Sequence, residues 1–158
     1  RLKYLDLSHN ALETLPSKLG RLKELRTLKV NNNRLITLPS SISSCGFLKR
    51  VDLSSNEFTS LSFIPPECIN LRILAVAHNH ITKIPLAIVN MPNLELLDLQ
   101  ANEISTLRAP GGGKYYICAG ASQPSRRILS QARKAVAYQK TKVQSNTGVG
   151  QIRERVSR

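Results

Sequence analysis

Asparagine recurs at a constant interval of 23 residues, and this period constrains the fold more than any other feature of the 158-residue chain. Each of these asparagines is the third residue from the end of a segment of the form Leu-x-x-Leu-x-Leu-x-x-Asn-x-Leu, with similar residues replacing some leucines. The five are Asn10, Asn33, Asn56, Asn79 and Asn102. A period of about 20 to 50 residues is typical of stacked units, none of which can bury its apolar face alone. The sequence therefore predicts a repeat fold.

Apolar residues alternate with mostly polar ones just before each asparagine, as expected for a strand with one buried side. The inward pairs are Leu5 and Leu7, Leu28 and Val30, Val51 and Leu53, Leu74 and Val76, and Leu97 and Leu99. Strands this short become stable only when successive repeats pair in parallel and stack their apolar residues into one core. The asparagine amide can bond backbone groups that the strands leave unpaired at the following turn. We therefore expect five amides stacked as a ladder.

The segments after the turn favour short helices on the opposite side. Pro16, Pro39 and Pro85 each precede apolar residues spaced three apart, which suits one or two helical turns. Repeat three has Ser62 in place of proline, so we expect an irregular segment there. The predicted fold class is α/β: a curved parallel sheet on the concave side, with short helices or 3-10 turns on the convex side.

These segments resemble the leucine-rich repeat family, and LPSKL, LPSSI and IPLAI resemble its intracellular LPxxI-type subclass of 23-residue repeats. The resemblance covers residues 2–108. It implies a solenoid that binds another protein, as a scaffold or signalling adaptor, on its concave surface. It implies no catalytic residue, cofactor or metal. The partner's identity does not follow from the resemblance.

The pattern divides the chain into three regions. Residues 1–108 form the five repeats, 109–124 a Gly/Pro-rich linker or partial cap, and 125–158 a basic tail that we expect to be part helical and part disordered. The sequence KYYIC, from Lys114, could add a last strand that covers the core. At the other end, the apolar residues of the first repeat would face water. Burying a leucine is worth about 1.5 to 3 kcal/mol, so we expect further repeats upstream.

Most of the net charge of +13 lies in the tail. Residues 1–108 carry 13 basic and 9 acidic side chains, a net of +4, whereas residues 109–158 carry 10 and 1, a net of +9. This suggests an alternative function, in which the tail binds nucleic acid, an acidic lipid surface or calmodulin. A third interpretation makes the chain a regulatory segment of a larger enzyme. No stretch has the ~20 apolar residues that span a membrane.

Strand residues between the inward leucines should project from the concave face in three columns. We take ten of them as candidate partner-binding residues: Tyr4, Asp6, Lys29, Arg50, Asp52, Ile73, Ala75, Ala77, Leu96 and Asp98. Four of these would form a contiguous apolar patch, which either binds a partner or is covered by the tail: Ile73, Ala75, Ala77 and Leu96. The charges of Asp6, Lys29 and Asp52 alternate, so we expect them to pair across neighbouring strands.

Seven residues before each asparagine, the repeats place basic side chains that would line one rim until Glu95 interrupts them: Lys3, Arg26, Lys49 and Arg72. Such a rim could steer an acidic partner, although a solvated charged edge is the simpler interpretation.

Histidine and cysteine residues show no catalytic or metal-binding pattern. His78 and His80 flank one asparagine, whereas His9 lies three repeats away, so no third ligand converges. Cys45 and Cys68 occupy an apolar position of the repeat and are expected to fill the core with free thiols. Three cysteines without close spacing favour a reducing compartment, and we predict a cytoplasmic protein. Nothing in the sequence resembles a nucleophile elbow, a phosphate loop or a paired-carboxylate site, so with the family resemblance we predict a non-enzymatic protein.

Overall fold

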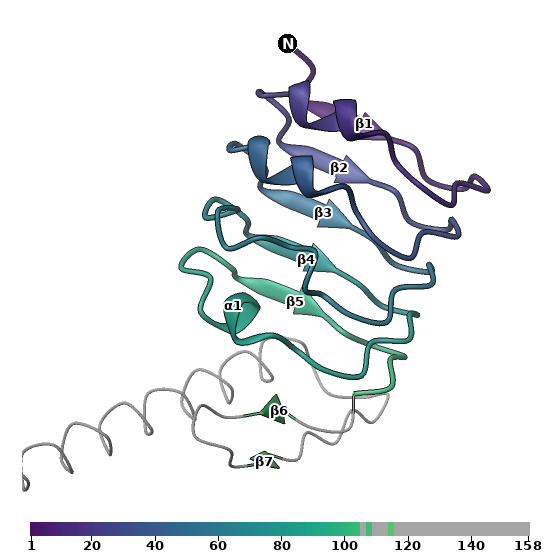
Figure 1. The fold of residues 1–158 in the computed structure, drawn as a ribbon, viewed down its shortest axis with the longest axis vertical. Coiled ribbons are helices and arrows are strands. Elements are labelled where there is room, and N and C mark those ends of the chain that lie inside the picture. The colour runs from purple at the N-terminus through teal and green to yellow at the C-terminus, as the bar shows by residue number, and fades with distance from the viewer. Residues whose placement is uncertain (105–106, 109–113, 116–158) are drawn as a thin grey trace, which may run out of the picture.

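Five short parallel strands form the central sheet of the computed structural model, which describes residues 1–104, 107–108 and 114–115. The strands are β1 (Tyr4–Asp6), β2 (Thr27–Lys29), β3 (Arg50–Asp52), β4 (Ile73–Ala75) and β5 (Leu96–Asp98). They follow one another across the sheet in chain order, so each coil of the chain lies directly on the preceding one (Figure 1).

The register of the sheet repeats without a shift from strand to strand. Leu5 pairs with Leu28, Leu28 with Val51, Val51 with Leu74, and Leu74 with Leu97. Each pair therefore joins residues 23 positions apart, as the sequence period requires. Constant register places every central apolar residue on the buried side of the sheet. The predicted stack of inward residues is confirmed.

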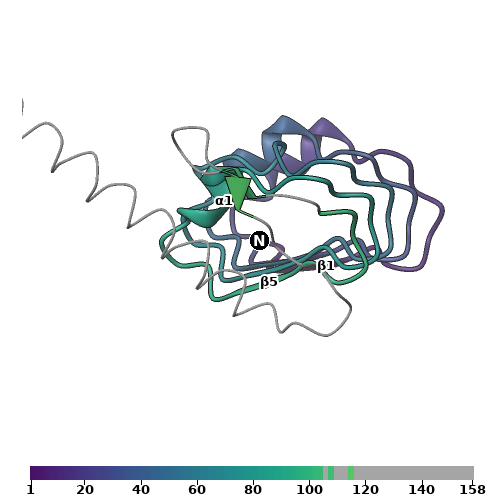
Figure 2. The same cartoon turned by 90° about the horizontal axis from the view of Figure 1, so that it is seen from below.

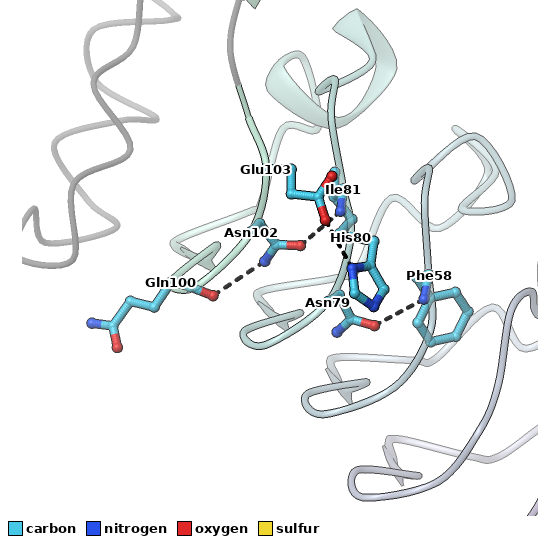
Figure 3. Close-up of polar contacts among 7 residues, drawn as sticks. All are labelled: Phe58, Asn79, His80, Ile81, Gln100, Asn102 and Glu103. Atoms are coloured by element: carbon cyan, nitrogen blue, oxygen red, sulfur yellow. Dashed lines mark hydrogen bonds and ion pairs between the residues drawn. The ribbon is translucent and has the colours of Figure 1, made fainter.

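The asparagine side chains form the predicted ladder. Asn56 Nδ2 donates 3.0 Å hydrogen bonds to the carbonyl oxygens of Val30 and Leu53, one in the preceding repeat and one in its own. Its Oδ1 accepts a 2.9 Å bond from the Leu35 backbone N–H. Asn79 makes the same set one repeat further on, and its bond from the Phe58 N–H is visible in Figure 3. These amides link neighbouring coils at the end of each strand.

The residue before each asparagine adopts a left-handed backbone conformation in all five repeats. The φ angles are 56° at His9, 55° at Asn32, 55° at Ser55, 53° at His78 and 49° at Ala101. None of these residues is glycine, although left-handed backbone is costly for residues with a Cβ atom. The repeated hydrogen bonding of the following asparagine holds the turn in this conformation.

Short helical segments lie opposite the sheet (Figure 2). They comprise the 3-10 helices η1 (Ser17–Arg21) and η2 (Ser40–Ser44) and the α-helix α1 (Leu86–Val89). A proline with extended backbone precedes each of them, as predicted. Repeat three has Ser62 instead, and the described backbone from residue 59 to 70 contains only bends and turns. The expected irregular segment is therefore confirmed.

The core fills the space between the sheet and the helical side. Leu28, Leu74 and Leu97 from the strands are fully buried, as are Ile42 and Ile88 from the helical side. Burial is weaker in the first coil, where Leu2 is 43% exposed and the side chains of Leu5, Leu7 and Leu12 are half-buried. The apolar face of the first coil is thus less buried than that of the other coils, and the further repeats expected upstream stay a prediction.

Lys114–Tyr115 form a strand, β7, but they do not extend the five-stranded sheet. They pair antiparallel with β6 (Leu107–Arg108) in a separate two-stranded sheet. Only five residues separate the two strands. A short connection suits an antiparallel pair, because a parallel pair needs a crossover of about a dozen residues. The rest of the predicted linker and the whole predicted tail, 125–158, lie outside the described residues.

Candidate partner-binding surface

The outward side of strands β1 to β5, here called the sheet face, holds most of the predicted partner-binding residues. The strand register aligns their backbones in two columns, one beginning with Tyr4, Thr27 and Arg50 and the other with Asp6, Lys29 and Asp52. Tyr4, Asp6 and Arg50 are exposed, whereas Lys29, Asp52 and Asp98 are half-buried. The sheet face therefore presents side chains from a backbone that the neighbouring strands hold in place.

A polar network fixes the sheet face at β1. The Asp6 carboxylate accepts hydrogen bonds from the Ser8 hydroxyl, from the Ser8 backbone N–H at 3.0 Å and from the Tyr4 hydroxyl at 2.9 Å. These bonds, first of all the one from the Ser8 hydroxyl, lower the pKa of Asp6 to about 2. Lys29 Nζ lies 3.9 Å from Asp6 Oδ2 and 5.7 Å from the Tyr4 ring centre.

The interaction with Tyr4 is the main cause that raises the pKa of Lys29, with smaller contributions from Asp6 and Asp52. The predicted pairing of Lys29 with Asp6 is thus confirmed. No ion pair within 4.0 Å joins Lys29 to Asp52 among the described side chains, and Asp52 Oδ1 instead accepts a 3.1 Å bond from the Ser54 N–H. Charged side chains at this end of the sheet face are held in defined positions.

The apolar part of the sheet face is smaller than predicted. Ile73, Ala75 and Leu96 are half-buried, so they present part of their surface to solvent. Ala77 is only 7% exposed, so the prediction that it projects from the concave face was wrong. Ser54 and Gln100 occupy the same repeat position in the adjoining coils, and neither of them is buried. Ile73 and Leu96 pair in register on adjacent strands, and they form the centre of the remaining apolar surface.

The basic residues along one edge form a continuous row in the structure. The backbone N–H of Lys49 donates a 2.8 Å bond to the Arg26 carbonyl oxygen, and Arg72 bonds Lys49 in the same way at 2.8 Å. The row ends where Glu95 bonds the Arg72 carbonyl, again at 2.8 Å. The side chains of Arg72 and Glu95 pair at 3.6 Å, so one of the four cations is neutralised.

Histidines do not converge on a site. His80 Nδ1 lies 2.8 Å from Glu103 Oε1 in the following repeat, an exposed contact shown in Figure 3. His9 and His78 occupy the left-handed turns. The described residues include no group of three or more histidine, cysteine, aspartate or glutamate side chains placed to hold a metal ion.

Cys45 and Cys68 are buried free thiols in adjacent repeats, as predicted. Burial raises the pKa of both, and that of Cys68 reaches about 11, with smaller contributions from Cys45 and Glu67. Protonated thiols behave as small apolar groups, which suits their place in the core. Cys118 lies outside the described residues.

Three large apolar side chains on the outside of the coils were not among the predicted site residues: Ile36, Phe47 and Ile69, which are 60%, 57% and 53% exposed. Phe47 occupies the repeat position of Glu24, and Ile69 that of Lys23, so a comparison of the repeats position by position could have found both. They lie in the turns that lead from the helical side back to the strands.

The irregular segment of repeat three borders a hollow on the outside of the coils. Its lining residues are Thr37, Leu38, Ser40, Ser43, Ser62, Phe63, Pro65 and Glu67. Phe63 packs against the buried Phe58, with 4.7 Å between the ring centres. The hydroxyls of Thr37 and Ser43 bond nearby backbone carbonyls.

Stacked coils with a parallel sheet on one side and short helices on the other define a repeat protein of the α/β solenoid class. Two family models match it: the leucine-rich repeat model at residues 1–22 and 24–45, and the model of two leucine-rich repeat copies at residues 69–109. The chain is a leucine-rich repeat protein. Proteins of this family generally bind other proteins, and the fold is typical of non-enzymatic binding modules.

Solved structures agree with this assignment. A leucine-rich repeat protein of Leptospira interrogans matches 68% of the chain with 34% identity and a TM-score of 0.63, and the match spans 27% of that protein. The ectodomain of the Arabidopsis thaliana receptor kinase GASSHO1/SCHENGEN3, solved in complex with CASPARIAN STRIP INTEGRITY FACTOR 2, matches 68% of the chain. That match has 30% identity and a TM-score of 0.55 and spans 13% of the ectodomain.

An internalin of Listeria monocytogenes shares the fold, with 21% identity and a TM-score of 0.50 over 60% of the chain and 31% of the internalin. No curated protein sequence matches the chain. Among the described residues, no helix is both long and apolar enough to span a membrane. The LPxxI subclass and the function assigned to the tail stay predictions.

Proposed function

We propose that the chain binds another protein through its sheet face, as a scaffold or signalling adaptor. One observation carries the proposal: five strands in constant register hold exposed charged residues at one end of the face and half-buried apolar residues at the other. Apolar surface beside placed charges is the usual composition of a protein interface, in which the apolar part supplies affinity and the charges supply specificity.

Rigidity supports the proposal. The backbone of each strand is bonded to its neighbours, and Asp6, Tyr4 and Lys29 hold one another in place. Side chains that are already ordered lose little conformational entropy when a partner binds. The Arabidopsis ectodomain in the comparison was solved in complex with another polypeptide. By analogy, a polypeptide is the class of ligand that we expect here.

We further propose an intracellular location. The two thiols of Cys45 and Cys68 are free and lie in adjacent repeats, and free thiols persist in reducing compartments. Expression of the complete protein with a fluorescent tag, followed by cell fractionation, tests this proposal. Recovery in the secreted fraction would contradict it.

The binding proposal is tested by capturing partners with the complete protein. We expect Ile73→Asp with Leu96→Asp to abolish capture of the specific partners, because two charges would replace the centre of the apolar surface. The matched control is Ile36→Asp, which places one charge at an exposed apolar residue off the sheet. Mass spectrometry identifies the retained proteins, and circular dichroism checks that each variant is folded.

Purified binding partners then give the quantitative result. We expect the double variant to weaken binding by at least about 10-fold, with the control within about 2-fold of wild type. If the folded double variant retains the same proteins with the same affinity, the sheet face is not the binding surface and the proposal fails.

A further inference from the structure

Phe47 and Ile69 lie in equivalent turns of two adjacent coils. The Leu48 N–H donates to the Cys45 carbonyl at 3.0 Å, and the Leu71 N–H donates to the Cys68 carbonyl at 3.1 Å, so both turns have the same hydrogen-bond pattern. Phe47 and Ile69 project from them with more than half of their surface exposed. Adjacent exposed apolar side chains of this size are typical of a contact surface rather than of an ordinary solvated edge.

Side-chain bonds hold these turns rigidly against each other. Asn70 Nδ2 donates a 2.7 Å bond to the Gly46 carbonyl, and Asn93 Nδ2 donates a 2.8 Å bond to the Ile69 carbonyl. Each bond crosses from one coil to the preceding one. The apolar pair therefore sits on a fixed backbone, and its ordering costs little when a ligand binds.

Two basic side chains without an acidic partner lie beside the apolar pair. Lys49 follows Phe47 by two residues, and the intervening Leu48 is 2% exposed, so Phe47 and Lys49 both project outward. The backbone of Arg26 bonds that of Lys49 in the adjoining coil. Among the described side chains, ion pairs within 4.0 Å involve neither Arg26 nor Lys49. Like charges one strand apart repel each other, and an anionic ligand would relieve that repulsion.

Spacing indicates the form of the anionic ligand. Adjacent coils of a parallel sheet lie about 4.8 Å apart, which is close to the 5 to 6 Å between side chains at positions i and i+4 of an α-helix. In a ligand with an extended backbone, alternate residues are about 6.6 Å apart, so its side chains would not stay aligned with successive coils of the edge. A helix also presents acidic and apolar residues side by side on adjoining faces, which matches the parallel rows of this edge.

A lipid surface or a nucleic acid fits this edge less well. Glu24 lies one coil before Phe47 at the same repeat position, and Glu95 ends the basic row. A continuous layer of phosphates would therefore meet two carboxylates. Stacking of nucleic-acid bases needs a series of aromatic side chains, whereas this edge offers one ring, that of Phe47. A short helix can avoid the carboxylates because its charges are limited in number and position.

We propose that Arg26, Phe47, Lys49 and Ile69 form a binding edge for an acidic amphipathic helix of a partner protein. The apolar pair packs on the apolar face of the helix, and the two cations bond its glutamate side chains. This edge lies outside the sheet face, so the proposal does not depend on the sheet face being a binding surface.

The test uses the full chain and a fluorescent helical peptide of about 16 residues, with glutamate on one face and leucine on the adjoining one. Controls are a scrambled peptide of the same composition, a peptide with lysine for every glutamate, phosphatidylserine vesicles and single-stranded DNA. Fluorescence anisotropy gives Kd for the peptides and the DNA, and vesicle sedimentation gives lipid binding.

We expect the acidic helix to bind and the scrambled and basic peptides to bind at least about 10-fold more weakly. Arg26→Glu with Lys49→Glu should weaken binding of the acidic helix by at least about 10-fold. Phe47→Ser with Ile69→Ser should weaken it by about 5-fold or more. The matched controls lie elsewhere on the surface: Lys18→Glu with Lys83→Glu for charge, and Ile36→Ser for apolar area. These should change Kd less than about 2-fold.

Ile73→Asp with Leu96→Asp should leave peptide binding unchanged, which separates this edge from the sheet face. Absence of peptide binding, or equal binding by the edge variants and wild type, would overturn the proposal. Tighter binding of vesicles or DNA than of the peptide, lost in the same edge variants, would overturn it in favour of a lipid or nucleic-acid ligand.

Discussion

The strand side of each coil has the same backbone geometry in every repeat, whereas the backbone of the helical side differs between repeats. After every strand, an asparagine follows a left-handed residue and bonds the carbonyl oxygen of the residue directly after its own strand. On the opposite side, the backbone is a 3-10 helix in two repeats, irregular in the third and an α-helix in the fourth. The same period therefore yields one repeated turn and several different return segments.

The difference follows from the kind of interaction on each side. Hydrogen bonds need particular atoms at particular distances, and the asparagine amide supplies both a donor and an acceptor of the right reach. Burial of apolar area has no direction, so leucine, cysteine or methionine can fill one repeat position, that of Leu22, Cys45, Cys68 and Met91, from backbones of different shape. Polar bonding fixes the geometry of the strand ends, whereas apolar packing fixes only the volume of the helical side.

Replacing Asn56 with alanine should be the most damaging way to test this difference. The variant leaves the buried Leu35 N–H without its acceptor and removes the amide bonds to Val30 and Leu53. Both carbonyls keep a bond from a neighbouring asparagine, so the orphaned N–H dominates the cost. We expect unfolding free energy to fall by about 3 kcal/mol, measured by urea denaturation.

Asn10→Ala is the matched control for that experiment. Asn10 is exposed, and in the described structure its side-chain amide bonds only the carbonyl oxygens of Leu7 and Ser8 in its own coil, at 3.0 Å each. Water can replace these bonds, so we expect a loss of about 1 kcal/mol or less. Equal losses in the two variants would show that the bonds between coils contribute nothing beyond those within a coil.

The sequence alone was sufficient to predict the strand side of the coils, whose geometry is determined by hydrogen bonds. The spacing of the asparagines predicted the strand register, the inward pairs and the amide ladder, because a constant period permits a single alignment of neighbouring coils. It also predicted the row of basic residues, whose backbones are bonded to one another. The pairing of Lys29 with Asp6 followed from the same register.

Side-chain accessibility and non-repeating segments could not be predicted to the same degree. Periodicity placed Ala77 in an outward column, but Ala77 is buried whereas Ala75, with the same side chain, is half-buried, so the place of a residue in the repeat does not by itself determine its exposure. β7 lies beyond the last repeat, where no register applies, and it pairs with β6 instead of the main sheet. Phe47 and Ile69 occupy positions at which the other repeats carry no large apolar residue, so the consensus pattern alone did not indicate them.

Gly20→Ala should break the packing of the helical side. A Cβ atom at Gly20 would lie 2.5 Å from the Ser41 carbonyl oxygen of the next coil, so η1 and η2 would have to separate. We expect a loss of about 1 to 3 kcal/mol in denaturant unfolding. Gly46→Ala is the control, because nothing lies within 4 Å of its Cβ position, and it should leave stability unchanged or raised by up to about 1 kcal/mol. A neutral Gly20→Ala would mean that the helical side adjusts freely.

Cys68 makes the stability of the helical side depend on pH. Its pKa is about 11 in the folded chain against an ordinary value of 9.0, so the folded state keeps the thiol proton where the unfolded state loses it. Folding therefore loses stability as pH rises from about 9 to about 11, and below pH 9 this contribution is fully present. Denaturation at several pH values should show a shallower decline for Cys68→Ala than for wild type. Identical slopes would exclude Cys68 as the cause.

Ala101→Gly should produce the smallest effect and tests whether the asparagine turns store backbone strain. Ala101 has a φ of 49°, where a Cβ atom costs energy that glycine avoids. Part of this gain is offset by the greater freedom of glycine in the unfolded chain, so we expect a net stabilisation of about 0.5 to 1 kcal/mol. Ala75→Gly in β4 should have the opposite sign and a similar size, because a strand gives glycine no such relief. Destabilisation by both variants would show that Ala101 adopts its backbone conformation without strain. The hydrogen bonds of Asn102 would then be sufficient to explain the conformation of the turn.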